Sequence, residues 1–376
     1  MNRFHKKSVP MFDLRIDDPI MKEELLESIA IVLDHGKLFL GPEVEEFEEK
    51  VAKYIGTKYA IGVGSGSSAL YLSLKACGIG PGDEVITSPL TWIISSNAIR
   101  ACGADTVFVD VGDDFNIDPE SIQKKITNKT RAIVPVHYAG HLCDMRRIKT
   151  IASNHDLIVV EDAAQAFGGS LDGINAGCFS LAAGLSMNPM KVLAGYGEAG
   201  AVVTDDQTVY ERVKRLRHAG TTSDPKKLIT NDCREISLNH KIDTINAAML
   251  LVAFRHLPER VSAREKIAKN YSSNLPPSIK PQETMDGETH ARYVYPITTV
   301  LRDELKKHLE ENGVETKIMH EPLVCDAPVY DGCNCEVPNA RKVLGNSLII
   351  PSHEKLSTDQ TQHVIDLMNQ FHKKCN

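Results

Sequence analysis

No stretch of this chain approaches the roughly 18 consecutive apolar residues that a membrane-spanning helix needs. The N-terminal residues MNRFHKKSVPMFDL are basic but hold no apolar run, so they do not have the pattern of a secretory signal peptide. The chain also has no excess of basic residues, because its 43 Lys and Arg residues are outnumbered by 50 Asp and Glu residues, which gives a net charge of −7. Without a basic field, nucleic acid is not an expected partner. We therefore expect a cytoplasmic protein that binds neither membranes nor nucleic acids.

Cysteine motifs are missing as well. The nine cysteines are an odd number and form no C-x-x-C pair. Four stand singly in apolar segments, at Cys77, Cys102, Cys143 and Cys178. This use of cysteine is typical of buried, reduced thiols in the cytosol. Three others cluster, at Cys325, Cys333 and Cys335. Because their spacing is not that of a zinc site, we expect no metal there.

The composition is that of an ordinary globular protein, with 42% hydrophobic and 25% charged residues. A chain of 376 residues is too long for one simple core, so it predicts two domains, or one large domain with an appendage. Because the net charge would repel an anionic substrate, such a substrate would need local Lys, Arg or backbone N–H groups.

Apolar strand patterns alternate with helical patterns through the first two thirds of the chain. Strands are expected at 59–65, 83–88, 105–110, 131–136, 157–161 and 199–204. Helices are expected at 67–77, 91–103, from 119, at 144–155 and at 206–218. This order predicts an α/β fold, with a mostly parallel sheet flanked by helices on both faces.

The rest of the chain has a different pattern. Residues 1–18 are expected to form an extended arm, and 20–34 and 41–56 to form helices. Residues 222–233 are polar and predict a long loop. From about residue 256 the pattern changes to helices at 258–273, 301–312 and 357–372, with strands at 292–299 and 347–350. We predict an arm at 1–18, a large domain at 19–255 and a smaller C-terminal α+β domain at 256–376.

Two residues carry the chemistry that this fold suggests. Leu157–Val160 is a four-residue apolar run, typical of a strand buried on both faces of a parallel sheet. Asp162 follows it, at the carboxyl end where α/β sheets bind ligands. A buried acid there and an amine at Lys191 are what a protein needs to hold pyridoxal phosphate, through a ring-nitrogen pair and a Schiff base. Alternatively, Asp162 caps a helix and Lys191 is a solvated surface residue.

Three weaker signals accompany this pair. VGSGSSAL (63–70) reads as a strand-to-helix turn, where Gly66 and Ser67 would contact a phosphate. A dinucleotide motif would need glycine at position 67, so that alternative fails. Trp92, the only tryptophan, could stack on a flat ring or fill a core or interface. Ser186, five residues before Lys191, could bind the phosphate or be an ordinary loop residue.

Taken in order, the motifs resemble a known family. They are GSGSSAL, PLTW, VHYAGHLCDM, VVEDAAQAFGG, S-x-x-x-x-K with GYGEAGAVVT, LRHAGT, LNHKIDTINAAML and KIMHEPL. From about residue 10 to 370 the chain resembles the DegT/DnrJ/EryC1/StrS sugar aminotransferases, which are fold-type I pyridoxal phosphate enzymes. The most specific parts are EDAAQAxG and the S-x-x-x-x-K block.

The resemblance implies a role for each candidate. Lys191 would bind the cofactor and move the proton, and Asp162 would pair with the pyridine nitrogen. Gln165 would lie near the phenolic oxygen, and Trp92 would stack on the ring. The phosphate would be bound by Gly66, Ser67 and Ser186, and by Asn239 of the neighbouring subunit in a homodimer with shared sites. His320, in the late H-x-P-L element, would lie near the substrate.

The chain also departs from the family pattern. Met187 follows Ser186, GEAG stands at 197–200 where G-E-G-G is usual, Lys241 stands where the family has arginine, and Glu321 replaces an aromatic. An ammonium in place of a planar guanidinium changes what can be recognised. The resemblance implies transamination of a keto-sugar nucleotide, with glutamate as the amino donor. A cyclitol or other non-nucleotide ketone, a sugar dehydratase and a non-catalytic binder are the alternatives.

Overall fold

A seven-stranded sheet forms the centre of the computed structural model, which describes residues 8–222, 232–330 and 335–375. Its order is β1-β9-β8-β5-β4-β2-β3. The strands are β1 (Tyr59–Val63), β2 (Glu84–Thr87), β3 (Asp105–Phe108), β4 (Thr130–Val134), β5 (Ile158–Asp162), β8 (Ala182–Ser186) and β9 (Gly200–Thr204). Only β9 runs against its neighbours, being antiparallel to both β8 and β1. The predicted α/β fold with a mostly parallel sheet is therefore confirmed.

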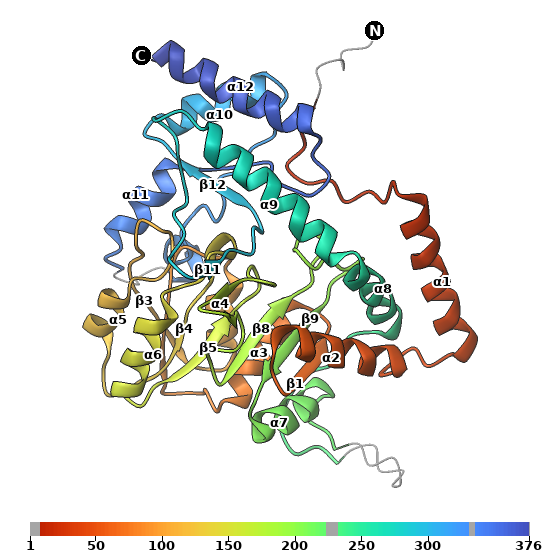
Figure 1. Ribbon diagram of the computed structural model, residues 1–376. Coiled ribbons are helices and arrows are strands. Elements are labelled where there is room, and N and C mark those ends of the chain that lie inside the picture. The colour runs from red at the N-terminus through yellow and green to blue at the C-terminus, as the bar shows by residue number, and fades with distance from the viewer. Residues whose placement is uncertain (1–7, 223–231, 331–334, 376) are drawn as a thin grey trace.

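Helices cover both faces of this sheet (Figure 1). They are α2 (Pro42–Ile55), α3 (Gly66–Ala76), α4 (Ile94–Ala101), α5 (Pro119–Lys125), α6 (Met145–Asn154), α7 (Gln207–Arg217) and α8 (Thr244–Arg255). Successive strand residues point to opposite faces. Val160 thus packs with α3 and α4, whereas Val159 packs in the core that α2 and α6 share. This double burial explains the continuous apolar strands of the sequence.

Aspartates set where many of the helices begin. Their carboxylates accept hydrogen bonds from first-turn N–H groups, which otherwise lack partners. These N-caps are Asp18, Asp118, Asp144, Asp206 and Asp243. Asp18 begins α1 (Pro19–His35), which stands apart from the sheet at the right of Figure 1 and packs on α8 through Met21, Leu25 and Val252.

The C-terminal third builds a second hydrophobic core above the sheet in Figure 1. It contains the antiparallel strands β10 (Lys280–Pro281), β12 (Tyr295–Thr298) and β13 (Ser347–Ile350). Its helices are α9 (Leu257–Asn274), α10 (Arg302–Glu311) and α12 (Thr358–Cys375), whereas α11 (Pro338–Asn346) packs its buried residues into the main core. Val9 of the extended N-terminal segment is buried in the same core. A domain division near residue 256 remains our proposal.

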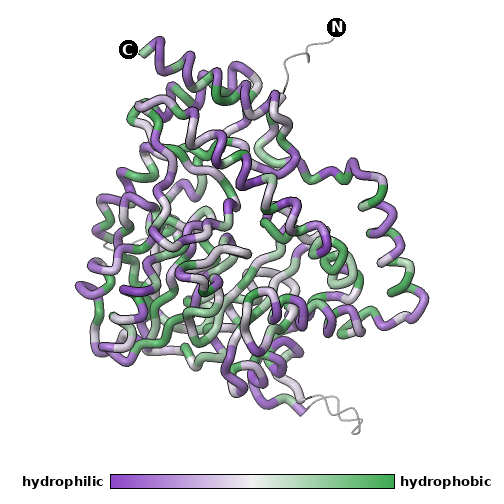
Figure 2. Tube along the Cα trace, viewed as in Figure 1, coloured by the Kyte–Doolittle hydropathy of each residue, from purple (hydrophilic) through white to green (hydrophobic). Residues whose placement is uncertain are grey.

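A small third sheet joins the two parts. Its strands β6 (Ser170–Leu171) and β7 (Ile174–Asn175) follow β5 in the chain, and β11 (Glu288–Thr289) pairs with β6. Three short 3-10 turns complete the described elements, at Tyr138–Gly140, Val324–Asp326 and Pro328–Tyr330. The hydropathy colouring of Figure 2 is predominantly green and white along the central strands and purple along much of the outer helices.

Several expectations need correction or fall outside the described residues. The helix expected at 91–103 begins only at Ile94, and β8 and α11 were not predicted. Most of the loop predicted at 222–233, and Cys333 of the cysteine cluster, lie outside the described residues. In the described ranges, no helix is long and apolar enough to cross a membrane. Those ranges also hold no group of three potential metal ligands.

Candidate active site

The predicted site residues gather at the carboxyl ends of neighbouring strands. Asp162 is the last residue of β5 and Ser186 the last of the adjacent β8. Gly66 begins α3, just beyond β1, and Trp92 lies between β2 and α4. Ligands of open α/β sheets bind at this edge. Asp162 and Ser186 are both buried there, whereas Trp92 is 62% exposed.

Asp162 has a buried carboxylate with two hydrogen-bond donors. Ser95 Oγ donates to Oδ2 at 2.7 Å, and the N–H of Ala164 donates to Oδ1 at 3.2 Å. Burial raises the pKa of Asp162, while these hydrogen bonds and the charge of Lys191 oppose the rise. A second cation, such as a protonated ring nitrogen, would favour the charged carboxylate here.

Lys191 lies on the connection between β8 and β9. Its backbone N–H donates to the carbonyl of Asn188 at 2.8 Å, which fixes a turn before the side chain. Its Nζ lies 4.0 Å from the centre of the Tyr293 ring. Burial lowers the pKa of Lys191 to about 8, although the charges of Asp162 and Glu198 oppose this. Near neutral pH, the amine is thus far more available as a base or nucleophile than an ordinary lysine.

The N-terminus of α3 and Ser186 form a close-fitting cradle. A Cβ added at Gly66 would lie 2.6 Å from Ser186 Cβ, so only glycine allows this approach. Ser65 caps the helix by accepting from the N–H of Ser68 at 3.1 Å, and Ser67 follows Gly66 in the first turn. A helix N-terminus beside a hydroxyl suits an anion such as phosphate.

Aromatic rings and a histidine line another side. The centre of the Trp92 ring is 6.4 Å from that of His320, which is 5.7 Å from that of Tyr138. Burial, together with the charges of Lys191 and Lys317, lowers the pKa of His320 to about 3. Its Nε2 has no hydrogen-bond partner within the described residues. A neutral histidine with a free nitrogen is suited to contact a ligand.

Gln165 and Asn239 have different surroundings. Gln165 is buried, and its Oε1 accepts from the N–H of Ala139 at 2.9 Å, so its amide NH₂ is the end left for a ligand. Asn239 is exposed, and its Oδ1 accepts from the N–H of Lys241 at 3.3 Å. The next residue, His240, contacts the first turn of α3, with its Nδ1 2.9 Å from Ser68 Oγ, and the role of Asn239 in a neighbouring subunit stays a prediction.

Some neighbours of these residues were not found from the sequence. Ser95 lies inside a quoted motif, but only the structure shows that it orients Asp162. Tyr293 lies more than a hundred residues from Lys191 and had no signal beyond an apolar strand pattern. Glu161, next to Asp162, faces away from it, where Ser180 Oγ and the N–H of Gly177 donate to its carboxylate.

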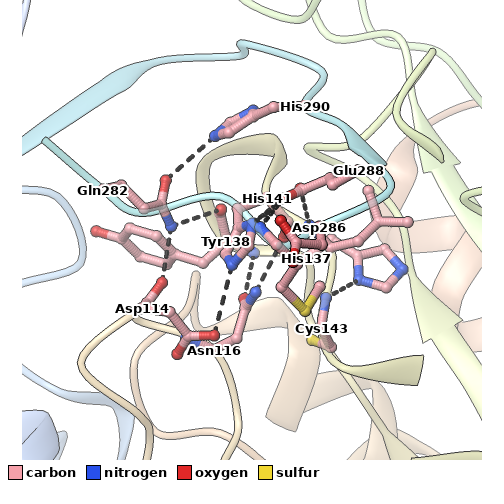
Figure 3. A network of polar contacts seen from close by, with 12 residues as sticks. Asp114, Asn116, His137, Tyr138, His141, Cys143, Gln282, Asp286, Glu288 and His290 are labelled. Atoms are coloured by element: carbon pink, nitrogen blue, oxygen red, sulfur yellow. Dashed lines mark hydrogen bonds and ion pairs between the residues drawn. The ribbon is translucent and has the colours of Figure 1, made fainter. Parts of the chain in front are cut away.

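A buried polar network lies beside the Tyr138–Gly140 turn (Figure 3). At its centre, His141 Nδ1 lies 2.7 Å from Glu288 Oε2, and Nε2 lies 3.4 Å from Asp114 Oδ2. Glu288 also accepts from the N–H of Leu142 at 2.9 Å. Gln282 donates to the carbonyl of Asp114 at 2.8 Å. The network fastens the 282–290 segment to the turn that contacts Gln165.

The His141–Glu288 pair is expected to make stability depend on pH. Burial alone would lower the pKa of His141, but Asp114 and Glu288 outweigh it and raise the pKa to about 9. A histidine whose pKa is raised by folding stabilises the folded state, and this stabilisation is complete below about pH 6.5, the pKa of histidine in the unfolded chain. That stabilisation, roughly 3 kcal/mol, is lost as pH rises through about 9.

Urea unfolding at pH 6 and pH 10 would measure this effect. His141→Gln should lose most of the difference between the two pH values, whereas the exposed His155→Gln should keep it. Parallel pH profiles for wild type and His141→Gln would contradict the assignment.

Comparison with known proteins gives these residues a context. The model of the DegT/DnrJ/EryC1/StrS aminotransferase family matches residues 19–369. The chain is 36% identical to the dTDP-3-amino-3,4,6-trideoxy-alpha-D-glucose transaminase of Streptomyces venezuelae, over 98% of each chain. It is 34% identical to a Geobacillus stearothermophilus protein named pleiotropic regulatory protein, over 97% of this chain and 99% of that one.

The fold has the same likeness. The crystal structure of S. venezuelae DesV in complex with a ketimine intermediate superposes with a TM-score of 0.92 at 36% identity. The alignment covers 97% of this chain and 98% of that chain. Aminotransferases of the matched family use pyridoxal phosphate.

Proposed function

We propose that this chain, which belongs to the DegT/DnrJ/EryC1/StrS aminotransferase family, transfers an amine from glutamate to a keto-sugar nucleotide. The chain is a pyridoxal phosphate-dependent aminotransferase. The observation that supports amine transfer is that Lys191, whose pKa burial lowers, and the buried Asp162 both lie at the carboxyl edge of the sheet. The sugar-nucleotide name of the Streptomyces relative supports the substrate class.

The residues present fit pyridoxal phosphate. Lys191 would link to its aldehyde, and Asp162 would face the ring nitrogen. The narrow cradle of Gly66 and Ser186 would hold the phosphate, with Ser67 beside it. Trp92 would cover the ring, and the NH₂ of Gln165 would face the phenolic oxygen. When bound, this cofactor supplies an electron sink that stabilises negative charge on the amine-bearing carbon.

The chain's own groups then move protons and hold positions. In each half of the reaction, Lys191 Nζ takes a proton from one carbon and delivers it to another, because its pKa of about 8 allows both states. Ser95 orients Asp162 by donating to Oδ2. His320 is neutral, so its free Nε2 can accept a hydrogen bond from a substrate hydroxyl.

We also propose a homodimer with shared sites. The backbones of Phe39 and Asp243 pair in a short antiparallel bridge. Apolar side chains near this bridge are exposed, with Phe39 69% and Leu238 70% exposed. Asn239 adjoins this patch, so a second copy that covers the patch would bring Asn239 toward the phosphate of its neighbour. Sedimentation as a monomer at micromolar concentration would contradict this assembly. A cytoplasmic location is proposed because buried free thiols such as Cys143 persist in a reducing compartment.

The visible spectrum with pyridoxal phosphate tests the proposed function. A yellow band of lysine-linked cofactor is expected, and glutamate should remove it. A dTDP-keto-sugar should then restore the band and leave an amino sugar. A band that responds to glutamate but is restored only by a keto-cyclitol would overturn the substrate class. A band that ignores glutamate but responds to another amino acid would overturn only the donor.

A further inference from the structure

Tyr293 is the aromatic residue that contacts the amine of Lys191. Nζ lies 4.0 Å from the ring centre, and the Tyr293 side chain is buried. A cation over an aromatic face is attracted by the negative charge of that face, most strongly where water is excluded. The ring therefore favours the ammonium form of Lys191 and gives the amine a defined place.

The backbone of Tyr293 is held from two sides. Its N–H donates to the carbonyl of Ala139 at 3.2 Å, and its carbonyl accepts from Arg264 Nη1 at 2.9 Å. Arg264 is buried and forms an ion pair of 2.7 Å with Glu354. Ala291, two residues earlier, donates to the carbonyl of Gly140 at 3.0 Å. The ring is thus placed by fixed backbone contacts rather than by a mobile loop.

The Tyr138–Gly140 turn that receives Tyr293 is itself fastened to the site. Gln165 Oε1 accepts from the N–H of Ala139, which has a φ of +60°. The His141–Glu288 pair clamps the chain just before Tyr293 to the residue that follows this turn (Figure 3). Glu288 is in β11, which pairs with β6, so the small third sheet also holds the backbone of Glu288 in place.

We propose that Tyr293 is a positioning residue, whose ring face seats the Lys191 amine at the carboxyl edge while the His141–Glu288 clamp holds that ring in place. This inference rests on the proposed role of Lys191. Without the ring, Lys191 would gain rotational freedom and lose an interaction that stabilises its protonated form. The ring face, and not the phenol hydroxyl, carries the effect.

The first test uses the protein without cofactor, so it does not depend on turnover. Acetylation of Lys191 by acetic anhydride would be followed against pH by mass spectrometry of the peptide that contains it. Tyr293→Leu should lower the midpoint by about 0.5–1 pH unit, whereas Tyr293→Phe should keep the wild-type midpoint. Tyr295→Leu is the matched control, because that ring lies in the C-terminal core and should leave the midpoint unchanged.

The second test uses the cofactor-loaded enzyme. Tyr293→Leu should lower kcat about tenfold or more, with a smaller change in the KM for glutamate, and Glu288→Gln should lower kcat in the same direction. If Tyr293→Leu does not fold, Tyr293→Met replaces it in both tests. An unchanged midpoint in the apolar variant, or an equal shift in Tyr293→Phe, would overturn the proposal. If the wild type shows no turnover but Tyr293→Leu shows the expected midpoint shift, the proposed function would be overturned, whereas the positioning of Lys191 by Tyr293 would be supported.

Discussion

Replacing Lys191 with alanine is expected to abolish amine transfer, with a loss of at least about 10³-fold in kcat. The change removes both the group that links the cofactor and the base at Nζ that moves the proton. The fold should persist, because the substitution shortens one side chain on a connection and leaves its backbone hydrogen bond to Asn188 available. Burial disfavours the lysine charge, so removing it should not lower the thermal midpoint.

A steady-state assay and thermal unfolding would be run together on Lys191→Ala. Lys342→Ala, which removes an exposed lysine paired with Asp113, is the matched control and should keep full activity. Partial return of turnover on adding a small amine such as ethylamine would show that a missing base, rather than a disturbed fold, is the cause. Transamination retained by Lys191→Ala alone would rule out its assigned role.

Asp162→Asn is expected to have the second largest effect, a loss of at least about 100-fold in kcat. Asparagine keeps the shape of the carboxylate and can still accept from Ser95, but it carries no negative charge for a protonated ring nitrogen. The electron sink should therefore weaken in both halves of the reaction, with protein stability near that of wild type.

Rapid mixing of Asp162→Asn with glutamate, and separately with the keto-sugar, would measure each half. Ser95→Ala should cost less than Asp162→Asn, because it loosens the carboxylate without neutralising it. A rate equal to that of wild type in Asp162→Asn would place the ring-nitrogen contact elsewhere.

The parts of the site that follow from the sequence are those fixed by one strand or one turn. Asp162 was predicted because a four-residue apolar run determines where β5 ends. Gly66 was predicted because small residues between a strand and a helix indicate a close backbone approach, and Ser186 is the group that approaches. These inferences need only local patterns and the rule that ligands bind at the carboxyl edge.

The parts that the sequence could not predict depend on contacts between distant segments. β8 reads AAGLS, whose small residues have no strong strand preference, and Gly184 lets α3 pack within contact distance of it. Tyr293 reaches Lys191, and Glu288 reaches His141, only because the C-terminal third folds back onto the Tyr138–Gly140 turn. Asn239 is predicted to act on a second copy of the chain, so no pattern within one chain would pair it with its target.

The antiparallel β9 has a consequence for protein synthesis. Its partner β1 leaves the ribosome long before it, because Tyr59 pairs with Thr204. At about 5–20 residues per second, roughly 7–30 s pass between the emergence of these two strands. During that interval β1 lacks its partner strand, and Gly66 has no Ser186 to approach until β8 has been made. The phosphate cradle is therefore a late product of translation, and a nascent chain stalled before β9 would expose an apolar strand that chaperones can bind.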